Sequence, residues 1–160
     1  MGEVVAQATR MMPDNLGKDY RIQIDPGLES APLVLAEKFV LAQIIQNLLM
    51  NAAEAVNQCE GEGGEILVSA ANDVATDGHD CVHLTVRDNG CGIPEEQLPK
   101  IFERGFTTKK SGKGGAGLHW CANSIAHLNG RIHAESAGPG QGATLHLELP
   151  VAATITRVAA

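Results

Sequence analysis

Three polar side chains share one face of the longest periodic segment in the chain. Asn47, Asn51 and Glu54 are spaced at i, i+4 and i+7 within residues 37–58, where apolar residues recur at helical steps. Asparagine is a poor helix former because its amide competes for backbone hydrogen bonds. Its carbonyl oxygen is, however, a neutral hard ligand of the kind that Mg²⁺ prefers. The spacing therefore fits either a magnesium-binding face or a polar stripe that faces water.

The segment Asp88–Ile93, with the sequence DNGCGI, is a second candidate for chemistry. Asn-Gly is a strong turn signal, so a tight turn after a strand explains the segment. It also suits a corner that binds a flat base. In that case the Asp88 carboxylate accepts hydrogen bonds from an exocyclic amine, and Gly90 and Gly92 let the backbone approach the ring closely.

Two further segments could handle phosphate groups. Glycines in residues 112–117 run directly into an expected helix, whose free N–H groups and dipole favour an anion. The run matches neither the Walker loop nor the dinucleotide fingerprint, and a flexible linker has the same composition. The other segment lies before this glycine run. It holds Arg104 and Lys109 in a loop that also holds Phe102 and Phe106. They could reach a triphosphate if this loop forms a lid; otherwise the two aromatics merely anchor a loop.

The surrounding pattern predicts an α+β domain. Helices are expected over residues 3–12, 37–58, 94–102 and 118–128, and strands over 20–24, 65–71, 81–88, 131–136 and 143–150, with a polar loop at 72–80. Hairpins mixed with helices favour one mostly antiparallel sheet with helices on one face. We expect residues 1–19 to form a helical lead-in, 20–150 the domain, and 151–160 a loose tail.

Composition and charge limit the classes of partner that this chain is expected to bind. The 160 residues carry 12 Lys and Arg against 19 Asp and Glu, a net charge of −7, which argues against nucleic acid and anionic membranes. No apolar run reaches about 18 residues, so we expect no membrane contact from this segment. Four cysteines at 59, 81, 91 and 121 form no C-x-x-C pair. We therefore expect no zinc site and no redox motif, but reduced thiols in a cytoplasmic domain.

Taken in order, these segments resemble the ATP-binding catalytic domain of two-component sensor histidine kinases. The matching motifs are N-L-L-M-N-A, D-N-G-C-G-I, I-F-E-R-G-F-T-T-K, G-x-G-L before a helix and G-x-G-A-T-L before the last strand. They correspond to the N, G1, F and G2 boxes of the Bergerat-fold (GHKL) family, and they cover about residues 20–150. The resemblance implies a two-layer α/β sandwich with a mobile ATP lid at residues 105–114.

The resemblance also implies roles for individual residues. Asn51 would bind the Mg²⁺ that bridges the phosphates, Asn47 would support the phosphates, and Asp88 would hold the adenine amino group. Arg104 and Lys109 would offset charge on the γ-phosphate. The other implied contacts are Gly90 and Gly92 beside the ring, Ile93, Phe106 and Leu118 as walls, Gly115 and Gly117 as amide donors, Thr107, Thr108 and Lys113 in the lid, and Thr144 in the adenine network.

The reaction implied is transfer of the γ-phosphoryl group of Mg-ATP to a histidine, with a response regulator downstream. None of the six histidines stands in a helical H-E or H-D pair followed by proline, so the acceptor is expected on a separate dimerisation and phosphoacceptor domain, and this chain as a monomer. Related ATPases carry a water-activating Glu where this chain has Asn47, and an amide is no base. A GHKL ATPase and a nucleotide-binding regulatory module remain the alternatives.

Two departures from the family pattern bear on the lid. Lys113 stands where the first glycine of G-x-G-x-G-L is expected, and His119 follows Leu118 where many members carry a small or apolar residue. We expect His119 to pack or cap at that junction rather than to take part in catalysis, because no partner for it is evident.

Overall fold

A computed structural model describes residues 1–13, 20–31, 34, 36–59, 63–107 and 115–151. Within these residues the strands form one five-stranded sheet in the order β1-β2-β3-β5-β4. The strands are β1 (Tyr20–Ile24), β2 (Gly64–Val74), β3 (Asp80–Asp88), β4 (Arg131–Glu135) and β5 (Ala143–Pro150). β1 runs parallel to β2, and the other neighbours are antiparallel. The expected mixed, mostly antiparallel sheet is confirmed.

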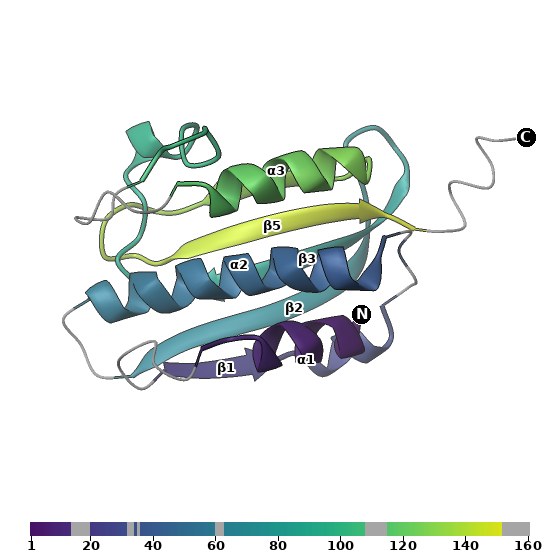
Figure 1. The fold of residues 1–160 in the computed structure, drawn as a ribbon, viewed down its shortest axis with the longest axis horizontal. Helices are drawn as coiled ribbons and strands as arrows, with labels where there is room; N and C mark the ends of the chain where they lie inside the picture. Colours follow the sequence, from purple (N-terminus) through teal and green to yellow (C-terminus); the bar gives the residue numbers. More distant parts are fainter. Residues whose placement is uncertain (14–19, 32–33, 35, 60–62, 108–114, 152–160) are drawn as a thin grey trace, which may run out of the picture.

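The helices α1 (Gly2–Arg10), α2 (Lys38–Gln58) and α3 (Gly117–His127) lie across one face of this sheet, with α2 in the middle (Figure 1). This arrangement confirms the α+β class and the two-layer sandwich. Sheet and helices bury their apolar faces against each other, which is why the sequence shows period 2 in the strands and helical steps in α2. The fully buried side chains of α2 at the centre of the core are Ala42, Ile44, Ile45, Leu48, Leu49 and Ala53.

The N-terminal helix belongs to the same core. Val5 and Ala8 of α1 are completely buried. The side chain of Gln46 on α2 donates a hydrogen bond to the carbonyl of Met11 just after α1. Among the described residues, α2 is the one helix that is long and apolar enough to cross a membrane. Core helices meet the same criteria of length and composition. Half of the most apolar stretch of α2 is buried in the domain.

Two expected elements differ from the structure. The helix expected over residues 94–102 is only the 3₁₀ turn η2 (Glu95–Gln97), followed by further turns. Ile101 is the single buried residue of this stretch, which leaves too little apolar contact to hold a longer helix. β2 extends to Val74, into the expected polar loop, because its residues pair with β3 as far as Asp80. Cross-strand pairing outweighs the low strand propensity of Asn72 and Asp73.

A candidate nucleotide site between α2, β3 and α3

A pocket of about 530 Å³ opens where α2, the segment after β3, the start of α3 and the start of β5 meet. Its volume is in the range of sites for small organic ligands. Of the residues expected in the site, those that line it are Asn47, Asn51, Asp88, Gly92, Ile93, Phe106, Thr107, Gly115, Gly117 and Leu118. Segments more than 70 positions apart in the sequence therefore converge on one cavity.

Asn47 and Asn51 form the polar wall on α2. The Asn51 side-chain nitrogen Nδ2 donates a hydrogen bond of 2.8 Å to the carbonyl of Asn47 one turn earlier. The amide oxygen Oδ1 of Asn51 is thereby left as a hard ligand atom at the pocket wall. The Oδ1 atom of Asn47 lies 3.3 Å from the place of a Cβ on Gly117, so Asn47 stands against the first turn of α3. These oxygens fit a magnesium ion.

Asp88 is the buried acid of the pocket, with 8% of its surface exposed. Its Oδ1 accepts a 2.8 Å hydrogen bond from the backbone N–H of Gly90. Burial raises the pKa of Asp88, and hydrogen bonds from the backbone N–H groups of Gly90 and Ala143 oppose the rise. An ionised carboxylate only accepts hydrogen bonds, so this end of the pocket favours a ligand that presents N–H donors.

The start of α3 forms the opposite end of the pocket. Ala116, the residue that caps the helix, makes no side-chain hydrogen bond to the first turn. Gly115 and Gly117 line the pocket there. The N–H groups of a helix start without a side-chain cap, together with the helix dipole, favour an anion such as a phosphate.

The two glycines of the D-N-G-C-G segment serve different contacts. A Cβ on Gly90 would lie 2.5 Å from the carbonyl carbon of Ala55 and 2.7 Å from the nitrogen of Val56, so Gly90 lets this segment cross α2 closely. Gly90 is not among the pocket-lining residues. Gly92 does line the pocket, with φ +69°, and a Cβ there would meet the Gly138 carbonyl oxygen at 2.1 Å. The close approach of Gly90 is thus to α2.

Thr144 and Arg104 do not reach the pocket in the structure. Ala143 and Leu145 line it, and alternation along β5 turns the intervening Thr144 side chain to the other face of the sheet. Thr144 is thus not among the lining residues, and its expected place in the adenine network stays a prediction, while Ala143 is the register partner of Asp88. Arg104 is exposed and outside the lining.

Three expected lid residues, Thr108, Lys109 and Lys113, lie outside the described residues. Sequence reasoning missed several lining residues that carry no distinctive chemistry. They are Met50, Ala52, Ala55, Gln58, Cys91, Pro94, Gln97, Ile101, Ala143 and Leu145. Helical spacing from Asn47 and Asn51 could have indicated those on α2, whereas the two on β5 required the sheet order.

His119 has a structural role, as expected. Its Nδ1 lies 3.0 Å from the carbonyl oxygen of Phe102, and its Nε2 lies 3.1 Å from the side-chain nitrogen of Asn123. The carbonyl can only accept and the amide nitrogen can only donate, so Nδ1 of the neutral ring carries the hydrogen. His119 therefore ties the turn after η2 to α3, beside the pocket.

Comparison with known proteins identifies the family of this chain. The family model described as histidine kinase-, DNA gyrase B-, and HSP90-like ATPase matches residues 37–153. Sensor kinase CckA of Brucella abortus is 35% identical over 159 residues, which is 92% of this chain and 16% of that protein. Sensor protein FixL of Bradyrhizobium diazoefficiens is 38% identical over 132 residues, 82% of this chain and 24% of that protein.

A solved structure gives the same answer for the fold. The catalytic domain of histidine kinase ThkA superposes with a TM-score of 0.70 at 28% identity, covering 94% of this chain and 91% of that one. The chain thus belongs to the family of histidine kinase-, DNA gyrase B- and HSP90-like ATPases, as an ATP-binding catalytic domain of the sensor histidine kinase type. This chain spans only 12% to 24% of the full length of three sensor kinases that it matches.

Proposed function

We propose that this domain binds Mg-ATP and donates the γ-phosphoryl group to a histidine on a separate dimerisation and phosphoacceptor domain. One observation carries the proposal: the pocket joins a buried carboxylate at one end to a helix N-terminus and an amide oxygen at the other. ATP has the matching ends, an exocyclic amine and a triphosphate. Phosphoryl transfer depends mainly on positioning and charge stabilisation, which such a pocket supplies.

Each end of the pocket then has its own task. Asp88 accepts a hydrogen bond from the adenine amino group, and Ile93, Phe106 and Leu118 enclose the ring. The first turn of α3, at Gly117, donates N–H groups to phosphate oxygens. Mg²⁺ held at this end of the pocket would offset the negative charge of the phosphate groups.

The metal and the lid complete the proposed phosphate site. Asn51 holds the ion through Oδ1, with Asn47 beside it. Arg104, together with Lys109 and Lys113 from outside the described residues, would offset charge on the γ-phosphate.

Transfer is favoured over hydrolysis by the residue one turn before Asn51. A hydrolase needs a base there to activate water, and the Asn47 amide cannot accept a proton at neutral pH. The acceptor histidine lies on another domain: none of the six histidines is in a helical H-E or H-D pair, and His79, which precedes Asp80, belongs to the β2–β3 turn.

The remaining assignments follow from this role. We propose a response regulator as the downstream partner, a cytoplasmic location for this segment, and domain bounds at residues 20–150 with a lead-in before and a tail after. The packing of α1 against α2 supports expressing the lead-in together with the domain.

The test is calorimetric titration with ADP and ATP, with and without Mg²⁺, on the chain and on Asn51→Ala. We expect Asn51→Ala to lose the gain in ATP affinity that Mg²⁺ confers while binding ADP without Mg²⁺ as before. Asn72→Ala, at an exposed position of β2, is the matched control. Retention of the full Mg²⁺ effect in Asn51→Ala would remove that residue from the metal site.

The transfer step is tested by adding phosphoacceptor domains of the relatives and following label from γ-labelled ATP. Label on an acceptor histidine supports the kinase assignment. Steady release of inorganic phosphate from the domain alone, with no labelled acceptor, would instead favour the ATPase alternative. Binding without either reaction would favour a regulatory module.

A further inference from the structure

Three histidines meet on the face of the sheet that the helices leave uncovered. His133 on β4 and His146 on β5 are register partners. His83 on β3 is diagonal to His146, whose own partner on β3 is Thr85. The residues that alternate with them along the strands face the core, as Leu84 and Leu145 show. This histidine cluster therefore lies on the opposite side of the sheet from the nucleotide pocket.

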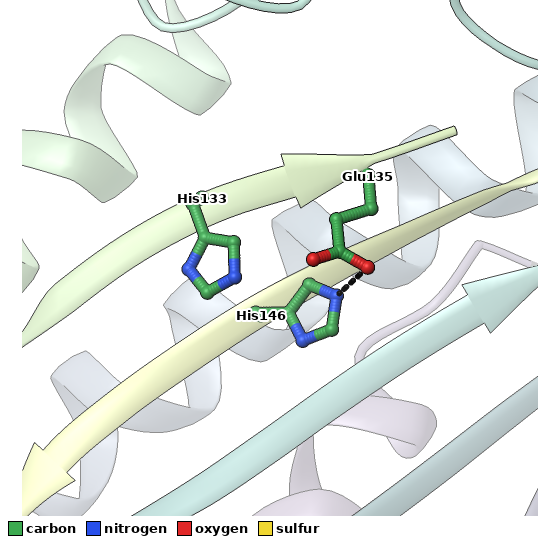
Figure 2. A group of neighbouring side chains, drawn as sticks. All are labelled: His133, Glu135 and His146. Carbon is green, nitrogen blue, oxygen red and sulfur yellow. Dashed lines mark ion pairs between the residues drawn. The ribbon is translucent and has the colours of Figure 1, made fainter. Parts of the chain in front are cut away.

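Two histidines of this cluster, His133 and His146, and the carboxylate of Glu135 are close enough to share one ion. The rings of His133 and His146 stack with centroids 4.4 Å apart and an interplanar angle of 2°. The carboxylate of Glu135 points toward His146, with 3.6 Å between its Oε2 and the Nε2 of that ring (Figure 2). One ligand atom from each of the three residues lies within 4.8 Å of the others.

Neighbouring hydrogen bonds fix which nitrogen of His146 carries the hydrogen. Nδ1 of His83 lies 3.4 Å from the Asp73 carboxylate, and Nε2 of His83 lies 2.9 Å from Nδ1 of His146. A carboxylate only accepts, so Nδ1 of His83 is the donor and its Nε2 accepts from His146. Nε2 of neutral His146 is then left with a lone pair, as a metal ligand requires. Ligating histidines commonly donate their other ring N–H in this way.

No hydrogen-bond partner for that lone pair is found among the residues that the structure describes. His146 Nε2 is buried and makes no hydrogen bond, and the nearest carboxylate oxygen, on Glu135, is also an acceptor. Two acceptors that face each other are complemented by a cation between them.

We propose that His133, Glu135 and His146 bind one Zn²⁺ ion on the outer face of the sheet, with water as the fourth ligand. Two imidazoles and one carboxylate suit zinc, whereas Mg²⁺ and Ca²⁺ prefer oxygen ligands throughout. Tetrahedral coordination brings the ligand atoms to about 3.3 Å from one another, so the His133 ring, which is parallel to the His146 ring in the metal-free chain, has to turn toward the ion on binding. The side chain of Glu135 is 70% exposed and has room to turn.

This proposal differs from the expectation, drawn from the cysteine spacing, that the chain has no zinc site. Its ligands come from β4 and β5, so the ion links the edge strand β4 to its neighbour. Zinc is therefore expected to raise the melting temperature of the chain in a concentration-dependent way. Because the site is on the far face from the nucleotide pocket, its test is independent of the proposed kinase function.

The experiment is titration of the metal-free chain with Zn²⁺ against a chromophoric chelator. We expect one ion per chain, loss of measurable binding in His146→Ala, and weaker binding in Glu135→Gln. His83→Ala, which removes the hydrogen-bond partner of His146, should weaken binding by roughly 10- to 100-fold. His127→Ala, an exposed histidine at the end of α3, is the control and should bind Zn²⁺ like the unmodified chain.

Co²⁺ provides the geometric test, since tetrahedral coordination gives intense visible absorption bands that octahedral coordination lacks. Absence of Zn²⁺ binding by the unmodified chain, or binding that His146→Ala leaves unchanged, would overturn the proposal. The circular dichroism spectrum and the urea unfolding transition of each variant report that it is folded. If His146→Ala fails this check, exposed Glu135→Gln decides instead, and unchanged Zn²⁺ affinity in that variant counts against the site.

Discussion

Replacing Asp88 by Asn should separate ligand binding from folding in this domain. The proposed contact joins the adenine amino group to a carboxylate that is only 8% exposed. A hydrogen bond to a charged group contributes about 1.5–3 kcal/mol, and the amide offers a donor where the ligand also has a donor. We therefore expect Asp88→Asn to weaken ADP binding roughly 10- to 150-fold, at 1.4 kcal/mol for each tenfold change.

The same change should stabilise the nucleotide-free chain. Burial raises the pKa of Asp88 in the folded state, so the folded chain protonates this group at a higher pH than the unfolded chain does. Ionised Asp88 therefore lowers the free energy of unfolding above its folded pKa. The penalty is relieved as the pH falls from that pKa to the unfolded value. Asp88→Asn has no such penalty, so its advantage is present at neutral pH and shrinks in acid.

The two expected effects are measured on the same protein preparations. Calorimetry gives the ADP affinity, and urea denaturation at neutral and acidic pH gives the free energy of unfolding. Asp25→Asn is a matched control, because Asp25 also accepts a hydrogen bond from a backbone N–H two residues on, at Gly27, but is exposed and outside the pocket. Equal ADP affinity in Asp88→Asn and the unmodified chain would refute the adenine contact. A variant less stable than the unmodified chain at neutral pH would refute the burial argument.

Three further outcomes follow from packing and hydrogen bonding. Gly90→Ala should lower the free energy of unfolding, measured by urea denaturation, by about 1–3 kcal/mol, because the added Cβ would lie 2.5 Å from the α2 backbone. Gly2→Ala is the control and should not lower it, because the nearest atom to its added Cβ is 3.5 Å away. His119→Ala should cost about 1 kcal/mol and speed hydrogen exchange in the turn after η2. Burial raises the pKa of Cys121 to about 12, so in the folded chain mass spectrometry should find an alkylating reagent on half-buried Cys59 before Cys121.

The fold could be predicted where local pattern and tertiary packing agree. The bounds of β1 and β5 match the expected strands, since period-2 alternation there reflects one face buried in the core. The pattern failed where packing overrides local preference. β2 continues through polar residues because β3 offers partners, and the segment after Pro94 stays a 3₁₀ turn because little of it is buried. The partner strand of β2 lies outside its own sequence, whereas Pro99 inside residues 94–102 is a local signal against a longer helix.

The site could be predicted for residues with distinctive chemistry on a helix or in a glycine turn. Asn47, Asn51 and Asp88 do meet in one pocket, as their spacing and order indicated. On β5 the residue that lines the pocket is Ala143, whereas the residue expected in the adenine network is its neighbour Thr144. A step of one residue on a strand exchanges the two faces of the sheet. Alanine carries no chemical signal, so only the alternation with buried Leu145 could have indicated Ala143.

The same alternation explains why the histidine cluster is invisible in the sequence. Its residues come from three strands, and they meet only because β5, last in the chain, inserts between β3 and β4. Along β5, Leu145 lines the nucleotide pocket while His146 faces the cluster, so consecutive residues serve different sites. If the two faces act independently, Zn²⁺ should leave ADP affinity unchanged. A Zn²⁺-dependent change in ADP affinity that disappears in Glu135→Gln would instead show that β5 couples the two faces.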